Sequence, residues 1–96
     1  MPSYIMLVNW TEKGITNIKE SPSRLDTFKK GVEEAGGKVT RFYLTMGRYD
    51  MVAVADFPDD EAAASMILRT ASRGEVRSET LKAFPEDQYR NIIASI

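Results

Sequence analysis

The segment Tyr4–Trp10, which reads YIMLVNW, constrains the fold more than any other part of the sequence. Its apolar residues follow one another instead of alternating with polar ones, which is typical of a strand buried on both faces. The chain has 96 residues, enough for a single domain spanning residues 1–96 with one modest core. A fold for this sequence must therefore cover both sides of a sheet although the chain has few residues.

Composition excludes several classes of chemistry. The chain has no Cys and no His, so disulfides, thiolate nucleophiles, imidazole metal sites and Ser-His-Asp catalysis are absent. Its 13 basic and 14 acidic residues give a net charge of −1, which argues against a nucleic-acid partner. No apolar run reaches the roughly 18 residues of a membrane span, so we expect no membrane partner and a cytoplasmic location. The run Asp59-Asp60-Glu61 is interpreted as the acidic first turn of a helix, and we expect no metal or other cofactor.

Local signals along the chain predict alternating strands and helices. Ser21-Pro22 predicts a helix start with Ser21 as the N-cap, and Gly36-Gly37 predicts its end. Gly47-Arg48 is typical of a two-residue type II′ hairpin turn. The predicted elements are a strand at 4–10, a loop with one helical turn at 11–18, a helix at 22–35, strands at 38–46 and 49–57, a helix between the Asp59 cap and Gly74, a strand at 75–84 and a helix from 85 onwards.

This order, β-α-β-β-α-β with a C-terminal helix, predicts an α+β fold of the ferredoxin-like kind with a four-stranded antiparallel sheet. Right-handed crossovers place the first and third strands in the centre and both long helices on one face. The branched residues Ile5, Leu7, Val52 and Val54 are assigned to the helix face. The opposite face is then predicted to carry Tyr4, Met6, Val8, Trp10, Tyr49 and Met51.

An apolar sheet face left open is a larger patch than monomers usually tolerate. A second copy of the chain, packed sheet against sheet about a two-fold axis, is the simplest cover and predicts a homodimer or a higher multiple of it. The alternative is that the terminal helix folds back over the face. Its apolar residues recur at helical spacing and include Tyr89, Ile92, Ile93 and Ile96.

Several motifs, in order and over most of the chain, resemble the GYD-domain family of small bacterial and archaeal proteins. The motif that names the family appears as Gly47-Arg48-Tyr49-Asp50. The other matching stretches are Tyr4-Ile5, Asn9-Trp10-Thr11, Gly14-Ile15, Ser21-Pro22-Ser23-Arg24, Tyr43-Leu44-Thr45-Met46, Pro58-Asp59-Asp60-Glu61-Ala62 and Val76 to Phe84. The resemblance implies a dimeric α–β barrel assembly, in which two ferredoxin-like sheets face each other, and it brings no settled activity.

Candidate site residues are few, and each also has an ordinary structural interpretation. Asp50 and Tyr43 are the candidate catalytic residues, with Asp50 as a general base; the alternative is that Asp50 fixes the turn by accepting backbone hydrogen bonds. The candidate ligand-binding residues are Asn9, Trp10, Lys13, Tyr49 and Arg77. The aromatic ones among them equally fit a core or interface, and Arg77 equally fits an ion pair with Glu79.

Two functions from different classes follow. The first is an oligomeric domain that binds a small, partly apolar molecule without chemistry, which the shortage of catalytic groups favours. The second is a cofactor-independent enzyme, monooxygenase- or isomerase-like, that acts on a hydrophobic small molecule through Asp50, Tyr43, Asn9 and Trp10. Single-stranded RNA binding shares the topology, but the chain lacks the basic surroundings that such a sheet needs.

Overall fold

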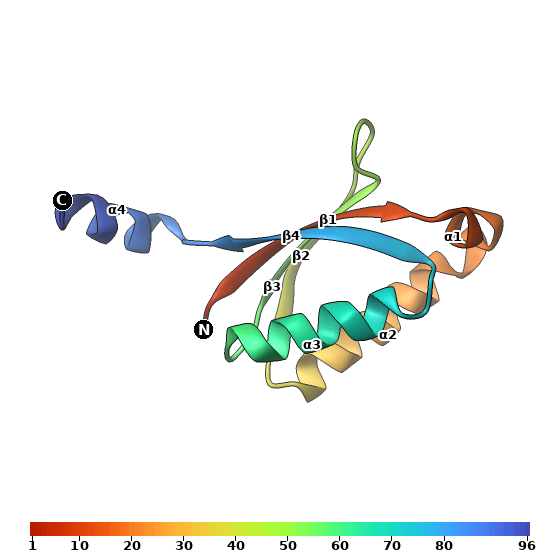
Figure 1. Cartoon of the computed structure of the whole chain (residues 1–96), viewed down its shortest axis with the longest axis horizontal. Coiled ribbons are helices and arrows are strands. Elements are labelled where there is room, and N and C mark those ends of the chain that lie inside the picture. Colours follow the sequence, from red (N-terminus) through yellow and green to blue (C-terminus); the bar gives the residue numbers. More distant parts are fainter.

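A computed structural model describes all residues, 1–96, as a four-stranded sheet with helices on one side (Figure 1). The elements are β1 (Ser3–Trp10), α1 (Glu12–Thr16), the 3₁₀ helix η1 (Ile18–Glu20), α2 (Ser21–Glu34), β2 (Lys38–Leu44), β3 (Met51–Asp56), α3 (Asp60–Ala71), β4 (Val76–Ala83) and α4 (Glu86–Ala94).

The sheet has the order β2-β3-β1-β4, and all three strand pairs are antiparallel. The central strand β1 runs from Ser3, opposite Ala83 of β4, to Trp10, opposite Val76. The two long helices, α2 and α3, lie side by side on one face (Figure 1). This arrangement confirms the predicted ferredoxin-like α+β fold.

The prediction of which residues face the helices was wrong. The side chains buried under α2 and α3 come from the positions assigned to the other face, including Tyr4, Met6 and Met51. Both faces of β1 are apolar, so alternation could not decide between them. The helix-facing positions of β3 include Ala53 and Ala55, and these small side chains let the helices approach the sheet closely.

The opposite side of the sheet is here named the open face. It carries apolar side chains from all four strands: Ile5, Leu7, Tyr43, Val52, Val54 and Leu81. No helix covers this side in Figure 1. Leu81 and Tyr43 are 44% and 55% exposed. The chain therefore still carries the uncovered apolar surface that the sequence predicts, with a different set of residues.

The core lies between the helices and the sheet. Its largest fully buried side chains are Phe57 and Val32, and the Phe57 ring meets Tyr4 edge to face at 5.6 Å between centroids. Ala63 and Met66 of α3 complete the contact with the sheet. The core is therefore built at the junction of β1, β3 and both long helices.

The helix caps follow simple side-chain chemistry, with one correction. The Asp59 carboxylate accepts from the backbone N–H of Ala62 at 2.8 Å, which confirms it as the N-cap of α3. Thr11 caps α1 in the same way. Ser21, however, is the first residue of α2 and not its N-cap, because its backbone is already helical with φ −56° and ψ −43°. Its hydroxyl accepts the indole N–H of Trp10 at 3.2 Å.

The connection between β2 and β3 is longer than predicted. It spans residues 45–50, and the Thr45 N–H donates to the Asp50 carbonyl at 2.8 Å across its base. Gly47 still has a positive φ of 138°, the left-handed region that the turn prediction requires of it. The two-residue turn was wrong because the pairing stops at Leu44 opposite Met51.

The C-terminal helix α4 projects away from the sheet beyond the end of β4 (Figure 1). It does not fold back over the open face, so that alternative is excluded for the single chain. None of the helices combines the length and the apolar run that crossing a bilayer requires.

Candidate functional site

A cavity of about 90 Å³ lies between the helix layer and the sheet. Most of its wall is apolar and comes from β1, α2, β2, β3 and α3. Phe28 and Leu25 approach it from α2, Ile67 from α3, and Met51 and Phe42 from the strands. A concave, mostly apolar space of this kind is the ordinary location of a ligand site.

The cavity continues into an open groove at the end of the sheet where β1 finishes. The groove has a volume of about 410 Å³ and shares Ser21, Leu25, Phe42 and Met51 with the cavity wall. Its other lining residues are Trp10, Ile18, Pro22 and Leu44. An interior space and an exterior apolar surface thus meet in one place.

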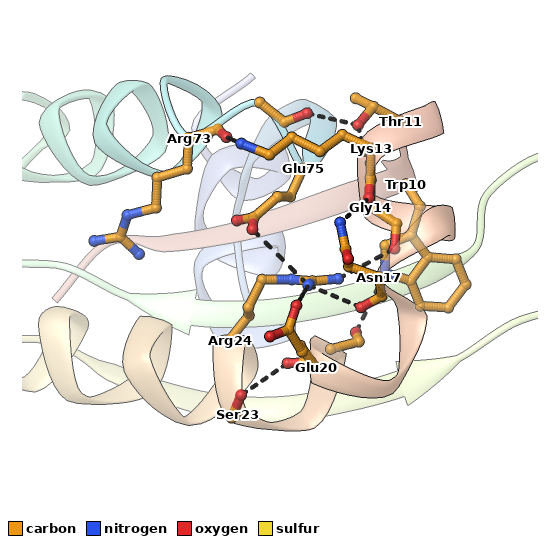
Figure 2. Close-up of polar contacts among 12 residues, drawn as sticks. Trp10, Thr11, Lys13, Gly14, Asn17, Glu20, Ser23, Arg24, Arg73 and Glu75 are labelled. Atoms are coloured by element: carbon orange, nitrogen blue, oxygen red, sulfur yellow. Dashed lines mark hydrogen bonds and ion pairs between the residues drawn. The ribbon is translucent and has the colours of Figure 1, made fainter.

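Polar side chains gather where the cavity reaches the surface, and Arg24 of α2 lies at their centre (Figure 2). Its guanidinium donates to the carbonyl oxygens of Asn17 at 3.1 Å and Gly14 at 3.3 Å. It also lies 3.9 Å from the carboxylates of both Glu20 and Glu75. Arg24 therefore joins α1, η1, α2 and the start of β4 into one polar rim.

The loop between α3 and β4 is held to α1 by a second set of contacts (Figure 2). The Lys13 ammonium donates to the carbonyl of Arg73 at 3.0 Å, and the Thr11 hydroxyl donates to the carbonyl of Gly74 at 2.6 Å. Lys13 therefore contributes to holding this loop, which is a structural role.

The side chain of Arg73 also lines the cavity and makes no hydrogen bond or ion pair with the rest of the chain. Arg24, by contrast, already has carbonyl and carboxylate partners. A molecule with an apolar body and one anionic group would match this arrangement, because an arginine binds a carboxylate by charge-assisted hydrogen bonds.

Three of the sequence-predicted residues meet at the base of the β2–β3 connection. The Asp50 carboxylate accepts from the Trp10 backbone N–H at 3.0 Å, and the Asp50 N–H donates to the Asn9 side chain at 2.9 Å. These bonds fix the loop against β1, which is the structural interpretation of Asp50. Of this group, only Trp10 lines the groove.

The remaining candidates lie on the open face. Tyr43 is exposed on the edge strand β2, and Arg77 stands opposite Asn9 in the β1–β4 register. Tyr49 donates to the Glu79 carboxylate at 3.0 Å, and this bond raises the pKa of the Tyr49 hydroxyl. Asp50 and Tyr43 are therefore not brought together around the cavity.

Sequence reasoning missed the residues that form the cavity. Leu25 and Phe28 fit an apolar helix stripe, and nothing in a stripe distinguishes a cavity wall from a packed core. The signal that was available is the charge of Arg24 on the same helix face as Leu25 and Phe28, since a buried-facing charge requires partners.

A separate polar cluster joins the other end of the sheet to α3. The buried Tyr4 donates its hydroxyl hydrogen bond to Asp60, whose carboxylate also lies 3.0 Å from the Lys82 ammonium. Burial, followed by the hydrogen bond to the carboxylate, raises the pKa of Tyr4 from 10.0 to about 12. The Tyr4 and Lys82 contacts lower the pKa of Asp60.

These shifts predict a pH dependence of stability at both extremes. A tyrosine with a raised pKa in the folded state stabilises fully below 10.0 and loses this contribution as the pH rises towards about 12. Asp60 has a lowered pKa in the folded state. It therefore stabilises the fold at any pH above its unfolded-state pKa, and this stabilisation is lost as the pH falls through its folded-state pKa.

We expect Tyr4→Phe to remove most of the alkaline decline in the free energy of unfolding. Chemical denaturation at a series of pH values measures it, and Tyr89→Phe, in the exposed part of α4, serves as the control. An unchanged alkaline decline in Tyr4→Phe would contradict the assignment.

Fold and cavity together define a small ferredoxin-like domain with a mostly apolar, partly open cavity between its helices and its sheet. Residues 4–93 match the GYD domain, and the chain belongs to this family. A relative from Thermus thermophilus, named glutamine synthetase and cystathionine beta-lyase binding protein, is 34% identical over 86 residues. The match covers 88% of this chain and 90% of the relative.

Solved structures of low sequence identity share the fold. A second Thermus thermophilus match, known from its crystal structure, superposes with a TM-score of 0.56 at 24% identity, over 88% of this chain and 94% of its own. The leucine response regulatory protein of Mycobacterium tuberculosis superposes with a TM-score of 0.64 at 17% identity, over 86% of this chain. The match spans only 50% of that regulator's length.

Proposed function

We propose that this chain is a binding protein whose helix–sheet cavity holds a small, partly apolar molecule. The observation that carries the proposal is the apolar cavity of about 90 Å³ with its polar rim. The space lies beneath two helices, opens to the surface and is lined mostly by apolar side chains, which is the usual character of a small-molecule site. Its few convergent polar groups are what fixes the orientation of a ligand.

Binding is better supported than catalysis. The residues that would carry out proton transfer are engaged elsewhere, since Asp50 holds the loop backbone and Tyr43 lies on the open face. The cavity wall presents Thr70, whose hydroxyl donates to the Met66 carbonyl at 2.8 Å, and its one acid, Glu75, lies 3.9 Å from the Arg24 guanidinium. The arrangement can hold and orient a molecule without reacting with it.

Benzoate, which has an apolar ring and one carboxylate, is a suitable probe. We expect a titration followed by NMR to shift the amide signals of Phe42, Met51 and Ala53. Ala71→Phe places a ring at the exposed edge of the cavity and should weaken binding about tenfold, a change of about 1.4 kcal/mol. Ala64→Phe, exposed on the same helix but outside the cavity wall, is the matched control.

The outcome that supports the site is a loss of affinity in Ala71→Phe alone. Equal binding by both variants would place benzoate on the open face or another surface and would contradict the cavity as the site. Shifts confined to residues of the open face, such as Leu7 and Val54, would lead to the same conclusion.

A second role, protein binding, is favoured by the open face and by the name of the Thermus relative, which gives that protein two enzymes as partners. We propose that the occupant of the open face is a second copy of this chain. Its apolar side chains come from all four strands and form a patch that a two-fold axis can make self-complementary.

Leu7→Lys is expected to convert the assembly to a monomer, because sheet-to-sheet packing would bury the new charge without a partner. Light scattering coupled to size exclusion measures the mass against the 10.8 kDa of one chain. Leu68→Lys, at an exposed position of α3, should leave the mass unchanged. A wild-type chain that is already monomeric would leave the open face free for a different protein, such as an enzyme.

A further inference from the structure

The terminal helix α4 makes little contact with the body of its own chain. Its apolar residues Tyr89, Ile92 and Ile93, and Ile96 just beyond its end, are all exposed, from 45% for Ile92 to 97% for Ile96. The longest extent of the chain is 49 Å, and α4 forms one end of it (Figure 1). The radius of gyration is 14.3 Å. A compact chain of this length would have about 12.5 Å.

The helix α4 has little intrinsic stability. α4 has nine residues, and isolated helices shorter than about 12–15 residues are marginal in water. The Arg90–Glu86 pair at 2.8 Å is exposed and adds little to this. An amphipathic helix that is ordered therefore requires a surface on which its apolar side packs.

The open groove is an apolar surface that lies outside the reach of α4 from the same chain. It lies at the Trp10–Val76 end of the β1–β4 pair, whereas α4 follows Ala83 at the other end. The seven steps of β4 between these ends span about 23 Å. Three Cα–Cα steps, through Phe84 and Pro85, join Ala83 to Glu86, at most about 11 Å of chain. α4 itself is about 13.5 Å long, so even a straight link and helix end about 24 Å from Ala83. The groove extends to Leu44 of β2, three strands and about 14 Å to the side of β4, so α4 cannot lie along it in its own chain.

We propose that α4 is an exchanged arm, which lies in the open groove of a second copy of this chain. Its apolar side would contact Ile18 of η1 and Leu44 of β2, which is 69% exposed, on either side of Trp10. Each chain has one exposed apolar helix and one exposed apolar groove. In a dimer, the helix of each chain can therefore cover the groove of the other.

In the proposed contact, α4 of the partner forms part of the wall of the binding site. The groove shares four wall residues with the helix–sheet cavity, so an arm lying in it covers the cavity from outside. A two-fold axis that runs across the strands brings the Ala83 end of one copy to the Trp10 end of the other. The same symmetry is compatible with packing of the two open faces. The contact itself does not require a bound ligand, so its test is independent of the proposed small molecule.

Trp10 gives a direct readout, because it is the only tryptophan of the chain and lines the groove. We expect its fluorescence emission to shift to longer wavelength on dilution of the wild-type protein, as the arm leaves and water enters. Ile93→Asp should show the shifted emission at every concentration. Asn91→Asp, the same change of charge on the polar side of α4, should behave like the wild type.

Disulfide trapping identifies the contact, since the chain has no cysteine of its own. We expect an Ile93→Cys variant mixed with a Leu44→Cys variant to form a covalent heterodimer under mild oxidation. Ile93→Cys mixed with Lys30→Cys, at an exposed position on α2, should not. Equal cross-linking in both mixtures, no cross-linking in either, or an emission that is independent of both dilution and Ile93→Asp would overturn the proposal.

Discussion

Replacement of Phe57 by alanine is expected to lower the free energy of unfolding by about 3–5 kcal/mol. The side chain is fully buried and meets the Tyr4 ring edge to face at 5.6 Å. Truncation loses the burial of the ring and leaves a void at the junction of the sheet with α3. A domain of this size is stable by only about 5–15 kcal/mol, so the variant should be close to unfolding.

Urea denaturation followed by circular dichroism measures this loss. Leu68→Ala is the matched control, because Leu68 is apolar but 69% exposed on the outer side of α3. We expect the control to change stability by no more than about 0.5 kcal/mol. A Phe57→Ala variant as stable as the control would contradict the placement of the core between the helices and the sheet.

Gly14→Ala is expected to cost about 1–3 kcal/mol, the usual range for overpacking a filled interior. A Cβ atom at Gly14 would lie 2.1 Å from the carbonyl oxygen of Glu75 and 3.2 Å from the Trp10 ring. The nearest neighbour is backbone, so α1 must move away from the start of β4. The Gly14 carbonyl also accepts from Arg24, so the same movement disturbs the polar rim, and benzoate should bind more weakly.

Gly31→Ala separates this clash from the general effect of an added methyl group. At Gly31 the new Cβ would lie 2.8 Å from the terminal carbon of Met66, which is flexible and can turn aside. Alanine also has a better helix propensity than glycine by about 1 kcal/mol, and this offsets the displacement. Thermal unfolding of both variants should show a clear loss for Gly14→Ala only; equal losses would rule out the close approach of α1 to Glu75.

Much of the fold could be predicted from short-range signals. The Asp59 cap and the order of the apolar segments were predicted correctly, because each rests on chemistry within a few residues. The prediction exchanged the two faces of β1 because both are apolar. Which face packs under the helices depends on Ala53 and Ala55, on a strand far away in the sequence. The turn after Leu44 was too short because its pairing depends on β1 as well, where the Asp50 N–H donates to the Val8 carbonyl at 2.9 Å.

The candidate site was harder to predict than the fold. Asp50, Tyr49 and Arg77 stood out by residue type, but a reactive type says nothing about which face of the sheet it occupies. The cavity is formed by residues such as Leu25, Phe28 and Ile67, whose individual chemistry is that of any core. Only the spacing of α2, α3 and the sheet makes these residues the wall of one cavity, and that spacing is a property of the whole packing.

The most direct test of the binding function is native mass spectrometry of the protein purified from its own host. We expect a multiple of the 10.8 kDa chain that carries a small non-covalent adduct, and an Ala71→Phe protein from the same host that has lost the adduct. An adduct retained by Ala71→Phe, or a wild-type protein that arrives empty and also fails to bind benzoate, would contradict the cavity as a binding site.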